Sequence, residues 1–364
     1  MGLATHGSGL SSRWFSLLLL LLAGMLVLLG ACEREIDFDD VVAQRYLFVD
    51  GAVTVGSDEH AFVVGRTAGP GQNRFDTVTD ATLTLTDLAT EQTVVCPNGA
   101  SGRYACALAG AYDRGYRLEV SLPGGEVYAA EAAPLREAAV DLSLSAGPSR
   151  RIGTDGAEIA GDRLRVRLSA SPAPQSPPVV LLTSSELGWS YIDVSTSILE
   201  PARACYFVDP VLQSLSVLDA TQAAPGETLA ADIAELDIGA RVALRAAVRV
   251  SVSRYPAAAL PYLRTLTPAI RQDGSIFAER PYTALGNVRA VGSGGDDDAA
   301  VPMLGYVGVR ELRALVVPVS TALGDARRPR GLCFEGRPTA GIYDCFECLN
   351  SPGASAVPPP WWPF

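Results

Sequence analysis

Residues 241–252 read RVALRAAVRVSV, the clearest strand pattern in the chain. Every second position, starting at Val242, is Val, Leu or Ala, and the positions between them include Arg241, Arg245 and Arg249. Because successive side chains of a strand point to opposite faces of its sheet, the pattern predicts one apolar face and one arginine-bearing face. A strand of this kind is typical of a sheet that is buried on one side only.

Other short runs repeat this alternation along the chain. Residues 81–86 read ATLTLT and residues 163–168 read RLRVRL. The chain also holds 25 prolines and 35 glycines, which break it into short segments. Many short strands separated by turn residues are typical of β-sandwiches. One helix is predicted at 257–270, because Leu260, Leu263, Leu266 and Ile270 recur at near-helical spacing.

We therefore predict an all-β fold of two β-sandwich-like domains, immunoglobulin- or transthyretin-like. The second domain contains the one short helix, and a disulfide-stapled tail follows it. Removing residues 1–31 from the 364 leaves 333, which is enough for two domains. The predicted segments are a signal peptide at 1–31, a lipidated tether at 32–44, the first sandwich at 45–135, the second at 136–322 and a Cys/Pro-rich tail at 323–364.

The first 32 residues predict export and lipidation. Arg13 precedes an apolar run at 14–29, which is followed by Gly30, Ala31 and Cys32. A charged region, an apolar region and small residues directly before a cysteine form a bacterial lipobox. Cleavage before Cys32 would leave this cysteine to carry acyl chains such as palmitate. The alternative is a membrane-spanning anchor, but the run is shorter than the roughly 20 residues that a spanning helix needs.

The residues directly after Cys32 predict where the protein faces. Residues 33–40 read EREIDFDD. Acidic residues at this place resemble the surface-export signals of Bacteroidota lipoproteins. They also suit a solvated tether, and the two interpretations are compatible. We expect a lipid-anchored protein of the outer membrane that is exposed at the cell surface.

The net charge excludes one class of partner. The leader carries a single charged side chain, Arg13, so the mature chain has 28 basic and 40 acidic residues and a net charge of −12. Sequence-independent binding to nucleic acid depends on cations that meet phosphates. We therefore expect no nucleic-acid partner.

Six cysteines remain besides Cys32, and an even number in an exported chain favours disulfides, here with 15 connectivities. Cys96 and Cys106 flank the turn-forming residues 97–102, which predicts a disulfide across a hairpin. The pairing of the other four stays open. The CxxC spacing of the last two also allows a redox pair, or a zinc site completed by others of the four, but structural disulfides are favoured. These four cysteines are Cys205, Cys333, Cys345 and Cys348.

Catalytic residues are hard to find. After cleavage His60 is the only histidine, and we expect it to be an exposed loop residue rather than the base of a Ser-His-Asp triad. Glu186 lies near Trp189, which could stack on a sugar, although a core tryptophan is favoured. The acidic stretch at 292–298 is interpreted as a solvated loop rather than a calcium site. We identify no catalytic residues and predict that the protein is not an enzyme. We also predict that it holds no metal and no cofactor.

Two arginine stripes are the remaining candidate site. One consists of Arg163, Arg165 and Arg167, and the other of Arg241, Arg245 and Arg249. If their strands are neighbours, six guanidinium groups share a sheet face and can hold an anionic ligand. The alternative is that each arginine pairs with Asp or Glu on an adjacent strand.

A set of ordered motifs resembles a family of Bacteroidota outer-membrane lipoproteins known only as a domain of unknown function. In order, the motifs are Cys205-Tyr206, the helix running to 270, the stretches at 274–277, 285–288 and 303–307, the CxxC at 345–348 and the Pro/Trp-rich ending. This chain departs from the family pattern at Val307, where Phe is usual, and at Trp361-Trp362, where the family tends to end on Phe-Trp. The Gly-Asn and Gly-Tyr pairs at 286–287 and 305–306 are interpreted as fold determinants rather than a site.

The resemblance implies a partner, because such proteins are often encoded beside TonB-dependent receptors. We expect a non-catalytic accessory that docks on such a receptor and binds a small nutrient or glycan. One alternative is a structural or adhesive envelope protein without a ligand. The other is a carboxylate-based glycan hydrolase, which needs only two carboxylates at a suitable separation.

Overall fold

The structure is a computed structural model that describes residues 45–68, 74–152, 158–192, 204–211, 215–224, 226–237, 241, 245–271, 286–291, 303–319 and 348–364. Several sequence-based predictions lie outside these residues: the signal peptide, the lipidation site Cys32, the tether at 32–44, the acidic loop at 292–298, and the cysteines Cys333 and Cys345.

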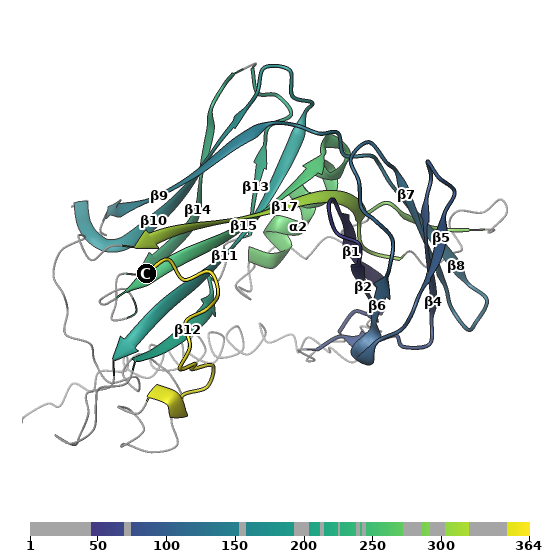
Figure 1. Cartoon of the computed structure of the whole chain (residues 1–364), viewed down its shortest axis with the longest axis horizontal. Helices are drawn as coiled ribbons and strands as arrows, with labels where there is room; N and C mark the ends of the chain where they lie inside the picture. Colours follow the sequence, from purple (N-terminus) through teal and green to yellow (C-terminus); the bar gives the residue numbers. More distant parts are fainter. Residues whose placement is uncertain are drawn as a thin grey trace, which may run out of the picture. The chain divides into compact units, whose positions relative to one another are not determined.

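The described residues form strands and one α-helix, which confirms the predicted all-β class (Figure 1). The strands of the first third are β1 Leu47–Thr54, β2 His60–Arg66, β3 Asp76–Thr77, β4 Thr82–Asp87, β5 Thr93–Cys96, β6 Arg103–Cys106, β7 Tyr116–Ser121 and β8 Val127–Ala132. The strands that follow are β9 Val140–Ile152, β10 Glu158–Pro172, β11 Val179–Ile192, β12 Ala204–Pro210, β13 Ser216–Asp219, β14 Leu229–Asp237, β15 Ala246–Pro256, β16 Val288–Ala290 and β17 Val307–Val319. The helices are α2 Leu260–Arg271 and the short 3₁₀ turns η2 Ala100–Gly102, η4 Ala257–Ala259 and η8 Cys348–Asn350.

The first sandwich packs two sheets around one core. One sheet has the order β16-β8-β7-β4-β5, and the other is the β17-β1-β2 part of a larger sheet, with β3 and β6 beside β2. The alternation at 81–86 behaves as predicted, because Leu83 and Leu85 are buried and the threonines are not. Tyr104 and Tyr116 are also fully buried. Their hydroxyls donate hydrogen bonds to the backbone carbonyls of Val78 and Ala109, respectively.

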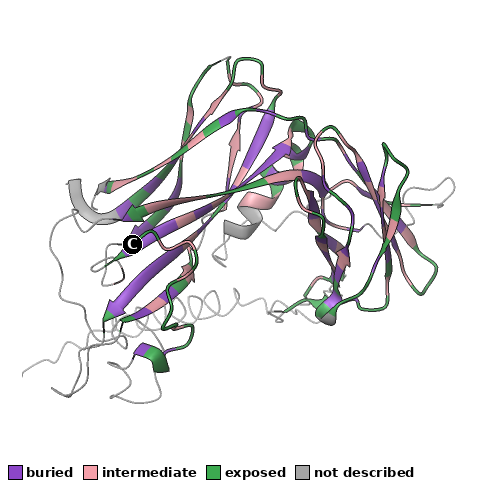
Figure 2. Cartoon of the chain, viewed as in Figure 1, coloured by how far each residue is buried: buried purple, intermediate pink, exposed green. Residues whose placement is uncertain are grey.

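The second sandwich is built in the same way. Its sheets are β14-β10-β9 and the β12-β11-β15-β17 part of the larger sheet. The stretch that predicted this layer overlaps β15, although residues 242–244 lie outside the described part. Val248, Val250 and Val252 enter the core and meet Leu164 and Leu168 of β10. Figure 2 shows the resulting alternation of buried and exposed residues along the strands.

The long strand β17 belongs to both sandwiches. Residues 307–310 pair in parallel with 51–54 of β1, and residues 311–319 pair antiparallel with 246–254 of β15. The short strand β16 adds to the edge of β8. The first core therefore contains residues 288–309 as well as 47–135, and a boundary at residue 135 does not separate the two cores.

The predicted helix is confirmed, and its site in the fold is the outer face of the larger sheet. Pro256 and the turn η4 lead directly into α2. Leu263 is buried in a small cluster with Ala52 of β1, Val180 of β11 and Tyr255 of β15. In the described residues, no helix combines the length and the apolar character that crossing a membrane requires.

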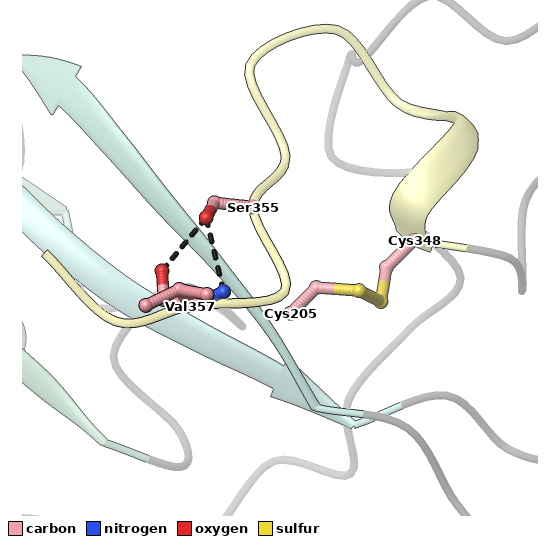
Figure 3. The surroundings of a disulfide bond; sticks show 4 residues. All are labelled: Cys205, Cys348, Ser355 and Val357. Carbon is pink, nitrogen blue, oxygen red and sulfur yellow. Dashed lines mark hydrogen bonds between the residues drawn. A yellow bond between two sulfur atoms is a disulfide. The ribbon is translucent and has the colours of Figure 1, made fainter.

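Two disulfides connect described cysteines. Cys96 and Cys106 are joined across the hairpin, as their flanking of a turn predicted. Cys205 of β12 is joined to Cys348 of η8, 143 residues later in the chain (Figure 3). Beyond the disulfide, Tyr206 and Ser355 exchange two backbone hydrogen bonds of 2.8 and 2.9 Å. The described tail at 348–364 is thus attached to the edge of β12, which confirms the predicted stapled tail.

The Gly-Asn and Gly-Tyr pairs at 286–287 and 305–306 lock two segments together. A Cβ on Gly286 would lie 1.6 Å from the carbonyl oxygen of Gly305, and Gly305 itself has a φ of +114°. The amide of Asn287 donates to the carbonyl oxygens of Glu131 and Val307 at 2.9 and 2.7 Å. These contacts are structural, in line with the role expected from the sequence.

Candidate functional site

The two arginine stripes do not form one surface. Arg165 and Arg167 lie on β10, in the three-stranded sheet, whereas Arg249 lies on β15, in the larger sheet. Both strands turn their apolar positions into the shared core between these sheets. The stripes therefore lie on opposite outer faces of the second sandwich, and six guanidinium groups do not gather there. For Arg163 the structure describes the backbone alone.

The arginines of the 241–249 stripe each meet a nearby group. Arg249 lies 3.5 Å from Glu186 of β11, and Arg241 lies 3.8 Å from Asp209 of β12. The guanidinium of Arg245 lies over the ring of Phe364, 5.7 Å from its centroid. Arg165 likewise lies 3.3 Å from Asp232 of β14. Pairing with Asp or Glu, the alternative interpretation, describes Arg249, Arg241 and Arg165, whereas Arg245 meets an aromatic ring instead.

His60 is not an exposed loop residue, so this prediction is wrong. It is 2% exposed and is the first residue of β2. Its Nδ1 accepts a hydrogen bond of 3.2 Å from the backbone N–H of Thr54, which places the proton of the neutral ring on Nε2. Burial lowers the pKa of His60, and Arg310 acts in the same direction, against the opposing effect of the Leu108 backbone. The residue looked like a loop because polar turn residues directly precede it.

Trp189 is a core residue, as predicted. It is 1% exposed and stacks on Phe207, with the ring centroids 4.4 Å apart. Its indole N–H donates to Asp209 at 2.7 Å. A ring buried in this way has no free face for a sugar. In the part of the chain that the structure describes, no three His, Cys, Asp or Glu side chains gather closely enough to hold a metal ion.

The candidate site is a cavity of about 580 Å³ between α2 and the outer face of the larger sheet. Its floor follows from the strand register. Ala52 of β1 lies opposite Gly308 of β17, and Ala61 of β2 lies opposite Ala105 of β6. These small side chains leave a depression across the strands, because successive residues on one face of a strand stand side by side with those of its neighbours.

Three tyrosines form the wall beside the helix. Tyr262 of α2 stacks on Tyr306, with centroids 5.4 Å apart and planes 20° apart, and Tyr255 meets Tyr306 edge to face at 6.5 Å. Gly308 permits this arrangement, since a Cβ there would lie 2.6 Å from the Tyr306 ring. Burial raises the pKa of Tyr262 and of Tyr306 to about 12, and Asp50 adds to the effect on Tyr262. All three hydroxyls therefore stay protonated at neutral pH.

Charged residues of both signs stand on either side of the small-residue floor. On one side Asp50 lies opposite Val63, which in turn lies opposite Arg103. On the other side Arg310 lies opposite Thr54 and donates from Nε to its hydroxyl at 3.2 Å. Glu59 also lines the cavity. Of the ion pairs that the described residues form, none includes these four charged residues.

Sequence reasoning did not find this cavity. Its lining comes from β1, β2, β6, β11, β15, α2 and β17, which are spread over more than 250 residues of the chain. One signal was present: Asp50-Gly51 interrupts an otherwise apolar strand, and Tyr306 follows a glycine. A second signal is the pair of tyrosines that flank Pro256 and Pro261 at the start of the helix.

Comparisons with known proteins give a family without a function. Residues 33–310 match the family described as "Domain of unknown function (DUF4249)". No curated protein matches the chain. The Fcho1 Mu homology domain of Danio rerio, solved with a bound Eps15 peptide, is 13% identical over 75% of this chain and 94% of that one, with a TM-score of 0.17. The FN1–FN3 domains of chicken CNTN1 are 7% identical over 58% of this chain and 92% of that one, with a TM-score of 0.13. TM-scores of this size establish no common fold.

Proposed function

The chain belongs to the family of domains of unknown function DUF4249, and from this premise we propose that it is a lipid-anchored outer-membrane protein that binds a small nutrient for a TonB-dependent receptor. The protein would face the cell surface and act as a non-catalytic accessory. The lipobox at Cys32 supports the anchor, and the family match begins at the next residue. The receptor is supported by the resemblance of the motifs to lipoproteins that are encoded beside such receptors.

The cavity beside α2 is the observation that carries the binding role. Its volume of about 580 Å³ falls within the roughly 300–1,000 Å³ of small-molecule sites. Its wall of tyrosines and leucines stands beside charged groups of both signs, which can fix the orientation of a polar ligand.

A second candidate, a glycan hydrolase, would use the same cavity, because Asp50 and Glu59 both line it. Such enzymes keep one carboxylic acid protonated, usually by placing it in an apolar environment. Both side chains are exposed here, which favours binding over hydrolysis. Release of reducing sugar from an oligosaccharide, lost in the double variant Asp50→Asn/Glu59→Gln, would support the hydrolase instead.

The receptor partnership can be tested in the native membrane. The tagged protein is extracted from outer membranes with a mild detergent, and co-purifying proteins are identified by mass spectrometry. We expect a TonB-dependent receptor in stoichiometric amount. The matched control is Cys32→Ser, which should lose acylation and fractionate away from the membrane with no receptor. Recovery of the anchored protein alone would contradict the proposal and favour a structural role or an independent binder.

A further inference from the structure

We propose that the ligand of the cavity is a short peptide with free termini, held by its ammonium group at Asp50 and by its carboxylate at Arg103. This inference rests on the proposed binding function and names the class of ligand. It starts from the two side chains, which line the same cavity and take part in no ion pair among the described residues. A ligand with both charges satisfies both groups, whereas a simple anion or cation satisfies one.

The spacing of the two residues favours a peptide over a single amino acid. Asp50, Val63 and Arg103 form one row across β1, β2 and β6. Two strand spacings separate the charged residues, which corresponds to roughly 10 Å between their Cα atoms. The ammonium and carboxylate groups of a free amino acid are bonded to the same carbon atom, and each further residue extends a peptide by about 3.8 Å. A dipeptide or tripeptide therefore reaches across the Val63 side chain.

The surroundings of Asp50 suit an ammonium group. Asp50 is close enough to Tyr262 to raise the pKa of its hydroxyl. The stacked rings of Tyr262 and Tyr306 lie in the same wall. A cation is attracted both to a carboxylate and to the face of an aromatic ring. The leucines of the wall, Leu182, Leu263 and Leu266, offer an apolar surface for a peptide side chain.

The surroundings of Arg103 suit a carboxylate. Its guanidinium can donate two parallel hydrogen bonds to the two oxygens of a carboxylate. Arg310 lines the same cavity and adds a second positive charge, while its Nε is held by Thr54. The floor of Ala52 and Ala61 runs beside the row from Asp50 to Arg103 and leaves room next to it for the atoms of a bound peptide.

The test uses the detergent-solubilised full-length protein and isothermal titration calorimetry. The probes are the dipeptide phenylalanyl-alanine, its N-acetylated form, its C-terminal amide and the neutral disaccharide cellobiose. We expect the free dipeptide to bind, each blocked form to bind about tenfold more weakly, and cellobiose not to bind. Equal affinity for free and blocked dipeptides, binding of cellobiose alone, or binding of no probe would each overturn the proposal.

Variants assign each terminus to its residue. Asp50→Asn should weaken binding of the free dipeptide about tenfold. The affinity for the N-acetylated dipeptide should not change, because that ligand already lacks the ammonium group that Asp50 would bind. Arg103→Gln should show the same pattern with the C-terminal amide. Asp141→Asn and Arg66→Gln are matched controls, since both residues are exposed on strands and lie outside the cavity lining. A variant that weakens free and blocked peptides equally would contradict the assignment of that terminus.

The outcome is separable from that of the receptor experiment. Receptor recovery without peptide binding would leave the accessory function standing and overturn the ligand class. Peptide binding without receptor recovery would leave the ligand class standing and overturn the accessory function.

Discussion

The side-chain amide of Asn287 pairs with the main chain of Val307 through two hydrogen bonds. Asn287 Nδ2 donates to the Val307 carbonyl at 2.7 Å, and the Val307 N–H donates to Asn287 Oδ1 at 2.9 Å. The same amide also reaches Glu131 at the end of β8. One side chain thus connects the start of β17 to the opposite sheet of the first sandwich.

Asn287→Ala should destabilise the fold substantially. Three hydrogen bonds are lost, and the polar backbone groups of Val307 lose their partner, so we expect a decrease of about 3 kcal/mol in the free energy of unfolding. Denaturant titration followed by circular dichroism measures it. The control is Asn98→Ala, an exposed residue whose amide meets only the Thr79 carbonyl. Equal losses in the two variants would contradict the role given to Asn287.

The two disulfides should differ in their contribution to stability. Cys205 and Cys348 are 143 residues apart, and Cys96 and Cys106 are 10 apart. Because a longer closed loop restricts the unfolded chain more, replacing the first pair by serines should cost about 2 kcal/mol more than replacing the second. Unfolding titrations of the two double variants measure this difference. Peptide mapping without reduction should recover Cys205 linked to Cys348; a Cys345–Cys348 link would contradict the pairing.

Gly188→Ala should loosen the C-terminal segment from the sheet. A Cβ on Gly188 would lie 2.5 Å from the Trp361 ring and 3.1 Å from that of Trp362. We expect the two rings to move outwards and become more accessible to acrylamide, which raises the quenching of tryptophan fluorescence. Trp189 is buried and contributes little to this quenching. Gly147→Ala is the matched control, because nothing lies within 4 Å of a Cβ at that strand position. Unchanged quenching in Gly188→Ala would show that the rings tolerate the added methyl group.

The tyrosine wall should produce a stability change at alkaline pH. The pKa of Tyr262 and of Tyr306 is raised to about 12, whereas a tyrosine in the unfolded chain has a pKa of about 10. The folded protein therefore holds protons that the unfolded chain releases. The contribution of these two tyrosines to the free energy of unfolding is fully present below pH 10. It decreases by roughly 2 kcal/mol for each tyrosine as the pH rises towards 12.

Absorbance at 295 nm checks this titration directly. We expect a late step near pH 12 that becomes smaller in Tyr262→Phe and in Tyr306→Phe. Tyr46 lies outside the wall, so the control variant Tyr46→Phe should leave this step unchanged. Complete titration of the native protein near pH 10 would contradict the burial of the two hydroxyls.

Local patterns in the sequence predicted local structure well. The apolar face of β15, the threonine-lined β4, the helix after Pro256 and the Cys96–Cys106 hairpin follow from side-chain period, proline position and short spacing. In each case the deciding interactions lie within about a dozen residues of one another.

Long-range pairing was beyond the reach of these patterns. The alternation of the two arginine stripes left open whether their strands are neighbours, and β10 and β15 belong to different sheets. His60 looked exposed because its burial depends on strands that come 40 or more residues later. The cavity depends on the parallel register of β1 with β17, which no local period encodes. Asp50, Arg103 and the three tyrosines were therefore not recognisable as one site.

The sharing of β17 between the two cores has a consequence for biogenesis. A ribosome delivers the chain from its N-terminus, but β1 cannot acquire its parallel neighbour until residues 307–310 have been synthesised. Until then one edge of β1 remains unpaired, and an open edge strand is prone to pair with other chains. The first sandwich, although it is encoded first, must be among the last parts to close.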